Sequence, residues 1–165
     1  MPTISPERAD ELVSAYAQGS RLIEDALAGI PDDELFYKPG PEHWSIFENV
    51  AHLADIDLIV AARIRFVLAV PGMPMPATDA AGWARAIDYS AWTLEDCLAL
   101  MRAARGSTAA LLRRAPVEAW ANTGVHSTYG PQTLEWIVGH MVKHAEVHLQ
   151  TIAKRRRQYA EARAG

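Results

Sequence analysis

The chain has little cysteine and no long apolar run. Its 165 residues include one cysteine, Cys97, which excludes an intramolecular disulfide and any metal site built from cysteines alone. No apolar run reaches the ~18 residues that a membrane-spanning helix needs, so we expect no membrane partner. The N-terminus lacks a basic start followed by an apolar stretch, which argues against a signal peptide. These absences favour a cytoplasmic protein.

The sequence also has no large excess of positive or negative charge. The formal net charge of -4 gives no global attraction to nucleic acid or to anionic membranes. The one basic run, residues 154–157, is expected to be a solvated helix end whose charges complement the helix dipole. A nucleic-acid surface would need further basic residues on the same face. Because half of the residues are hydrophobic, we expect residues 1–165 to form a single globular domain.

Four long segments carry the apolar spacing of amphipathic helices, and little in the sequence alternates as a strand does. Capping boxes mark two helix starts: Ser45 with Glu48, and more weakly Thr93 with Asp96. Prolines and a glycine within residues 70–76 end the second helix, and a short helix is compatible with residues 79–88. We therefore predict an all-α fold. Its four helices span about residues 6–28, 45–69, 93–114 and 131–160.

The lengths of the connections predict the topology. About 15 residues join the first two helices, a similar number joins the last two, and more than 20 separate the second from the third. A long link can cross the length of a bundle and leave the helices on either side of it parallel. The prediction is a four-helix bundle with up-down-down-up topology and a long connection between its second and third helices.

The most informative feature of the sequence is a row of histidines in the last helical segment. His140, His144 and His148 are spaced i, i+4 and i+8, so a helix would stack them as one stripe. The stripe lies close to the apolar face that should be buried. Burying several imidazoles is costly unless each finds a partner, and a divalent metal is the usual partner of clustered neutral imidazoles.

His52, in the second helix, is the fourth candidate ligand. A lone histidine on a helix is usually a hydrogen-bonded structural residue. The interpretation of His52 as a metal ligand is therefore supported only if the last helix places a pair of histidines nearby. An i, i+4 pair can chelate one ion, as the H-E-x-x-H helix does. The chain lacks that motif, because Glu146 has the wrong spacing and is expected at the surface. The alternative to a metal site is that these histidines form polar contacts between the helices without binding a metal.

Two motifs resemble the DinB-like (DNA-damage-inducible) superfamily. They are W-S-I-x-E-x-x-x-H-L-x-D at residues 44–55 and K-H-x-x-x-H-L-x-x-I at residues 143–152. The resemblance implies a four-helix bundle of up-down-down-up topology that is often dimeric. It also implies a divalent metal held by His52, His144 and His148, with His140 outside the ligand set but one turn away.

Three neutral imidazoles would leave coordination positions open, which is typical of a reactive metal rather than a structural one. Zinc or nickel is the first expectation, and iron, manganese or copper also suit such ligands. Open positions could bind water or the thiolate of a low-molecular-weight thiol. Relatives implied by the resemblance include thiol-dependent S-transferases and a mycothiol-dependent isomerase. We expect a metal-dependent enzyme acting on a small-molecule substrate, either transferase-like or hydrolase-like. The alternative is a non-catalytic metal-bound binding or stress-response module.

The remaining expectations concern single residues. Asp55 could orient a ligand imidazole or face solvent, and Asp57 could be the buried partner of an arginine or histidine or be exposed. Cys97 is expected to be structural, and His43 and His126 are expected in exposed loops.

A two-fold homodimer is also expected, because apolar residues of the long connection could form a patch that needs a partner. In the competing interpretation the connection covers its own bundle. The residues concerned are Met73, Met75, Trp83 and Trp92.

Overall fold

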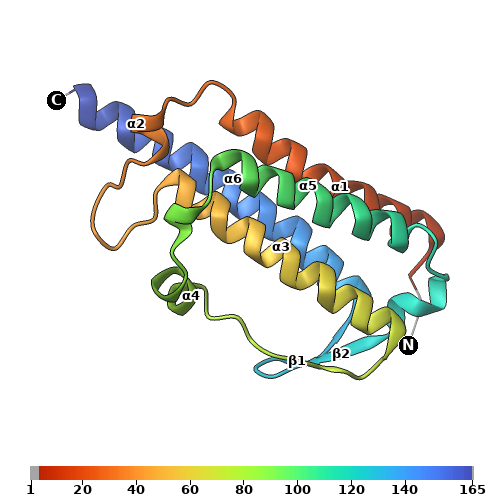
Figure 1. Cartoon of the computed structure of the whole chain (residues 1–165). Coiled ribbons are helices and arrows are strands. Elements are labelled where there is room, and N and C mark those ends of the chain that lie inside the picture. Colours follow the sequence, from red (N-terminus) through yellow and green to blue (C-terminus); the bar gives the residue numbers. More distant parts are fainter. Residues whose placement is uncertain (1–3, 165) are drawn as a thin grey trace.

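Four long helices form a bundle in the computed structural model, which describes residues 4–164 (Figure 1). Helix α1 packs against α5 and α6, and α3 packs against the same two helices, so α1 and α3 occupy opposite corners. Helices α1 and α6 run in one direction and α3 and α5 in the other, which confirms the up-down-down-up topology. The long helices are α1 (Pro6–Leu27), α3 (Ile46–Ala69), α5 (Leu94–Leu112) and α6 (Leu134–Ala164). The short elements are α2 (Asp32–Leu35), α4 (Ala80–Ala86), and the 3-10 turns η1 (Tyr89–Ala91) and η2 (Val117–Ala121).

Both predicted capping boxes are present. The Ser45 amide donates to Glu48 Oε2 (2.8 Å), and the Glu48 amide donates to Ser45 Oγ (3.1 Å). Thr93 and Asp96 form the same reciprocal pair at the start of α5. Because each box satisfies backbone donors that the first helical turn leaves unpaired, the starts of α3 and α5 are fixed. His52 therefore lies at a defined place in the second turn of α3.

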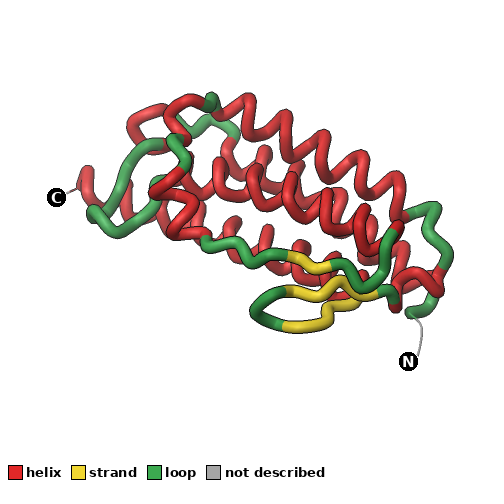
Figure 2. The backbone as a smooth tube through the Cα atoms, turned by 60° about the horizontal axis from the view of Figure 1, so that its bottom comes forward, coloured by secondary structure: helices red, strands yellow, loops and turns green. Residues whose placement is uncertain are grey.

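The sequence did not predict a small three-stranded sheet that stands beside the bundle, near the end of α3 and the start of α6 (Figure 2). Strand β2 (Thr123–His126) pairs in parallel with β1 (Pro74–Met75) and antiparallel with β3 (Gly130–Thr133). Helix α6 consequently begins three residues later than the predicted start at residue 131. The strands have two to four residues, too few for an alternating pattern to show.

An ion pair between Arg105 and Asp57 lies in the buried core. Arg105 Nε donates to Asp57 Oδ2 at 2.6 Å, and both side chains are 0% exposed. Arg105 Nη1 also donates to the carbonyl of Tyr16 (3.0 Å), and the guanidinium lies over the Tyr16 ring. A Cβ at Gly19 would lie 2.1 Å from Arg105 Nη1, so this close approach requires glycine. Asp57 is thus the buried partner of an arginine.

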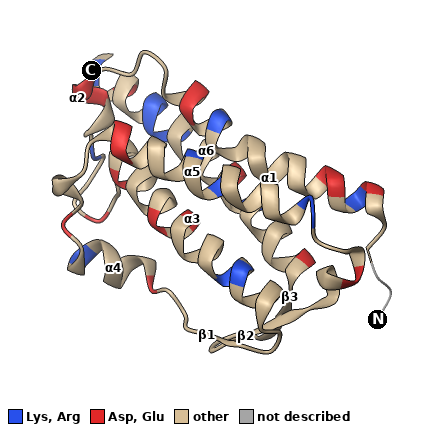
Figure 3. Cartoon of the chain, turned by 45° about the vertical axis from the view of Figure 1, so that its right-hand side comes forward, with Lys and Arg blue, Asp and Glu red and all other residues tan. Residues whose placement is uncertain are grey.

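Charged residues are spread over the helices (Figure 3), and the basic run at the end of α6 is less solvated than predicted. Arg155 is buried and donates to the carbonyl of Trp44 (2.8 Å). Arg156 pairs with Glu34 of α2 at 2.8 Å. The prediction of a solvated run holds for Lys154, Arg156 and Arg157, which are exposed, and is wrong for Arg155, because α6 packs there against the segment before α3.

The connection between α3 and α5 lies against its own bundle. Met75 is buried, whereas Met73, Trp83 and Trp92 are half-buried. This arrangement is the one expected if the connection covers its own bundle, so these residues do not supply the exposed patch on which the dimer prediction depended. The homodimer stays a prediction, and light scattering would test it, with a mass near the 18.1 kDa of one chain arguing against it. No helix among residues 4–164 is long and apolar enough to cross a membrane.

Candidate metal centre

Three imidazoles meet between α3 and α6. One ring nitrogen from each of His52, His144 and His148 lies within 4.8 Å of the others. The ring of His52 is centred 5.6 Å from that of His144 and 5.4 Å from that of His148, and the two α6 rings are 4.7 Å apart. The antiparallel packing of α3 on α6 therefore brings together residues that are far apart in the sequence. The three side chains could close onto one cation with small rotations.

The surroundings of these rings fit a bound cation. His52 and His148 are buried and His144 is half-buried. The Nδ1 atom of His144 is buried, and it has no hydrogen-bond partner among the described residues. A buried polar nitrogen left unpaired costs about 1–3 kcal/mol. A cation bound at Nδ1 of this imidazole would offset such a penalty.

The protonation state of the rings also suits a cation. Burial, together with the neighbouring histidines, lowers the pKa of His144 to about 3. Burial likewise lowers the pKa of His148 to about 4, with a smaller effect from His52. The pKa of His52 is lowered by burial, against a smaller opposing effect of Asp55. All three rings are therefore neutral at pH 7, the form in which imidazole binds metal.

Asn49 sets the orientation of His148, and the sequence analysis missed it. Its Nδ2 donates to the carbonyl of Ser45 (2.7 Å), which turns its Oδ1 toward His148 Nδ1 at 3.1 Å. Since this oxygen can only accept, His148 donates from Nδ1 and keeps the lone pair on Nε2. Asn49 is one helical turn before His52, so its spacing could have suggested a role beside the histidines.

We expect Asn49→Leu, which keeps the side-chain volume but removes the acceptor, to weaken zinc binding about 10–100-fold. The reason is that His148 would lose the partner that fixes its ring and tautomer. Calorimetric titration of the metal-free variant with Zn²⁺ measures the change. Gln150→Leu is the matched control, because Gln150 is an exposed amide on α6. Equal zinc affinity in the Asn49 variant and the wild type would contradict the assigned role.

Other candidate residues lie outside the cluster. His140 is exposed and stacks on Trp136, with ring centroids 4.8 Å apart and planes inclined by 9°. Asp55 is buried and accepts a hydrogen bond from the hydroxyl of Tyr89 (2.7 Å), so the structure shows neither of its two expected roles. Glu146 is exposed, as expected.

Among the remaining candidates, His43 is exposed and Cys97 is buried, both as expected. His126 departs from its expected place in an exposed loop. It ends β2 and is half-buried, because β2 pairs with strands on both sides.

A pocket of about 430 Å³ adjoins the cluster. His52 and His144 contribute to its wall, together with Ile56, Val60 and Met141. Residues of the long connection and of the β2–β3 hairpin close its other sides. The histidine cluster thus borders a cavity that could admit a small molecule.

The metal-free protein should lose stability in mild acid. The pKa values of His144 and His148 are lower in the folded chain than the ordinary value of 6.5, so the unfolded chain binds more protons below that pH. Their contribution is fully present above pH 6.5 and is lost as the pH falls toward 4 and 3. At pH 5 we expect a loss of about 2 kcal/mol for each histidine at most.

Urea unfolding of metal-free protein at pH 7.5 and 5 measures this loss. The His144→Gln, His148→Gln double variant should show a flatter dependence on pH. A wild-type free energy of unfolding that is equal at both values would contradict the expectation.

The fold and the cluster together define a class, that of up-down-down-up four-helix bundles with histidines gathered between the second and last long helices. The family pattern of the DinB superfamily matches residues 15–152, and the chain belongs to this superfamily.

Among solved structures the chain is similar to YfiT from Bacillus subtilis, described as "a probable metal-dependent hydrolase with an unusual four-helix bundle topology". The TM-score is 0.86, with 23% identity, over 97% of this chain and 92% of that one. At this identity the likeness establishes the fold. A search of curated proteins found no match.

Proposed function

We propose that the chain is a metal-dependent enzyme in which His52, His144 and His148 hold a divalent cation, with zinc or nickel as the first expectation. The observation that carries the proposal is that His52 and His144 also line the adjoining pocket. Three imidazoles would leave coordination positions of such a cation open, and the pocket that two of them line offers room for a small molecule. When bound, such a cation lowers the pKa of water or of a thiol and so supplies a nucleophile at neutral pH.

The residues of the chain prepare this site. Burial keeps the imidazoles neutral, and Asn49 fixes the ring of His148. The indole of Trp44 packs beside His52, with ring centroids 5.1 Å apart, and so limits the access of water to that side. The apolar side chains of Ile56, Val60 and Met141 offer contact surface for a substrate.

Two nucleophiles support different reaction classes. The description of YfiT as a probable metal-dependent hydrolase supports activated water. The motif resemblance to families with thiol-dependent S-transferases supports a low-molecular-weight thiol as cosubstrate. We place hydrolysis first because its second reactant is water, so the pocket of about 430 Å³ need not hold a second organic molecule.

A non-catalytic module is the second candidate. The observation that favours it is that no aspartate or glutamate of the described chain lines the pocket, which leaves no carboxylate there to act as a general base. Such a module would bind its ligand tightly without turnover.

Parallel assays of zinc-loaded and nickel-loaded protein separate the candidates. One assay follows hydrolysis of activated esters and amides, and the other follows consumption of glutathione with an electrophile such as 1-chloro-2,4-dinitrobenzene. We expect metal-dependent turnover in one assay and its loss in His148→Ala. Retained turnover in that variant would contradict the proposed site. Metal-dependent ligand binding without product in either assay would favour the module.

A further inference from the structure

Arg63 is a cation of α3 with no acidic partner in the part of the chain that the structure describes. Its Nη2 donates to the carbonyl of Pro76, which holds the plane of the guanidinium. Its Nε is buried and has no hydrogen-bond partner within residues 4–164. The ion pairs of the described chain do not include Arg63. Because a buried donor on a charged group is costly to leave unpaired, the free Nε–H points to an acceptor from outside the chain.

Arg63 lines the same pocket as His52 and His144. The wall also includes His126, whose Nδ1 accepts hydrogen bonds from the amides of Thr128 (3.1 Å) and Tyr129 (3.4 Å). A neutral ring that accepts at Nδ1 carries its proton at Nε2 and remains a donor there. The pocket therefore offers donors, and its described lining contains no carboxylate to neutralise Arg63.

The lining residues on α3 show that the pocket extends along this helix. His52, Ile56, Val60 and Arg63 recur at intervals of three or four residues and so form one stripe of the helix. Eleven residues separate the Cα atoms of His52 and Arg63 by about 16 Å along the helix axis. The histidine cluster and the guanidinium thus occupy opposite ends of a largely apolar groove.

We infer that the pocket takes an elongated substrate with a carboxylate at one end, received by Arg63 with the help of His126, and with its reacting group at the histidine cluster. One permanent cation matches the single charge of a carboxylate better than a doubly charged phosphate, and guanidinium donors fit the oxygens of a carboxylate. An apolar chain between the two ends would contact Ile56, Val60 and Met141. The reacting end rests on the proposed function, whereas the anion-binding end does not require the cation.

The test is calorimetric titration of metal-free protein with hexanoate, hexanamide and hexyl phosphate, which share one apolar chain. Hexanoate should bind about tenfold more tightly than hexanamide, the difference expected of one charge-assisted hydrogen bond. Arg63→Met should reduce the affinity for hexanoate to that for hexanamide. Arg21→Met removes an equal charge from an exposed position on α1 and should leave hexanoate binding unchanged.

Equal affinities for hexanoate and hexanamide in the wild type would overturn the inference, and this comparison needs no variant to fold. Unchanged hexanoate binding in Arg63→Met would overturn the role of Arg63. Tighter binding of hexyl phosphate than of hexanoate would overturn the carboxylate assignment. Because these titrations use metal-free protein, a failure to find metal-dependent turnover would leave their outcome unaltered.

Discussion

Protein in which His144 and His148 are both replaced by alanine is expected to bind no zinc or nickel at micromolar concentrations. The two residues supply two of three candidate ligands, and their rings are centred 4.7 Å apart on successive turns of α6. Losing one residue that merely orients a ligand lowers metal affinity about 10–100-fold. Losing two ligands should therefore lower it far more. Metal analysis after dialysis, together with titration by Zn²⁺ and Ni²⁺, measures the effect.

Two single variants serve as controls for this experiment. His43 is exposed and outside the cluster, so His43→Ala should bind metal as the wild type does. His140→Ala removes a histidine that stacks on His144, with ring centroids 6.1 Å apart, but that is not one of the three candidate ligands, so its metal content should stay close to the wild-type value. Full retention of metal by the double variant would refute the site.

Asp57→Ala is expected to destabilise the fold by about 3–5 kcal/mol, because it would leave the guanidinium of Arg105 buried without its counter-charge. Both side chains of this pair are 0% exposed, and their atoms are 2.6 Å apart. A change in the urea midpoint, monitored by far-ultraviolet circular dichroism, gives the loss in free energy of unfolding. A loss below about 1 kcal/mol would be typical of an exposed pair and would contradict the expectation.

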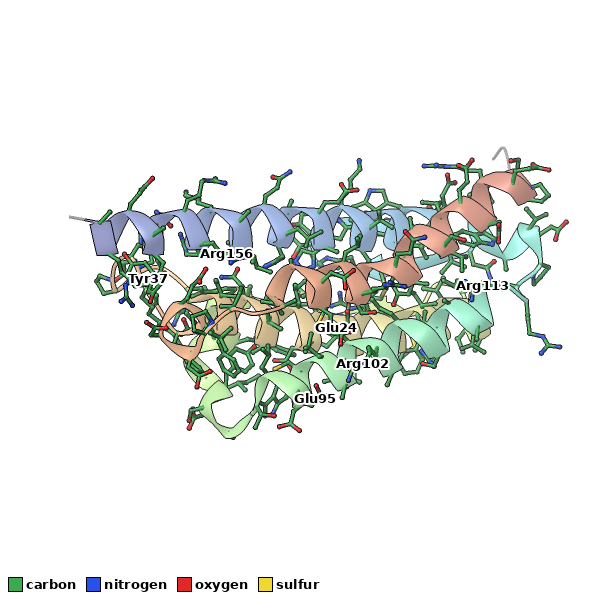
Figure 4. All side chains as sticks on the ribbon, turned by 90° about the horizontal axis from the view of Figure 1, so that it is seen from above. Glu24, Tyr37, Glu95, Arg102, Arg113 and Arg156 are labelled. Atoms are coloured by element: carbon green, nitrogen blue, oxygen red, sulfur yellow. The ribbon has the colours of Figure 1, made fainter. Side chains whose placement is uncertain are left out.

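An exposed ion pair supplies the matched control. Arg102 of α5 lies 3.0 Å from Glu24 of α1 (Figure 4), and both side chains are more than 40% exposed. Glu24→Ala should change stability by about 1 kcal/mol at most. The double variant Asp57→Leu, Arg105→Met should be more stable than Asp57→Ala, since it removes the buried charge instead of stranding it.

The sequence predicted those features that depend on interactions between residues close together in the chain. The capping boxes and the apolar spacing located the four long helices, and the spacing of His144 and His148 follows from helix geometry alone. The length of the connection after α3 then led to the topology. His52 could be grouped with the two α6 histidines from the motif resemblance, although nothing in its own neighbourhood distinguishes it from a structural histidine.

The features that were missed depend on contacts between distant segments. Asp57 pairs with Arg105, which is 48 residues away in the sequence. The sequence suggested that Asp57 could have a buried basic partner, but it could not identify that partner as Arg105. Asn49 contacts His148 across 99 residues, and that contact exists only once α3 and α6 are packed. The position of His126 at the end of a strand was missed because the three strands are too short to show the alternating sequence pattern of a β-strand.

The parallel course of α3 and α5 has a consequence for how relatives of this protein could diverge. The chain must return along the bundle between these helices, and on its way Ala77, Thr78 and Ala80 form part of the pocket wall. The floor of the pocket belongs to the helices that carry the histidines, whereas this wall belongs to the link between α3 and α5, in which Met75 is buried against the bundle but Ala77 is exposed. Changes in the composition of the link at these positions could therefore alter which molecules the pocket admits and leave the three histidines in place. The topology thus places one wall of the pocket and the histidine cluster on different segments of the chain.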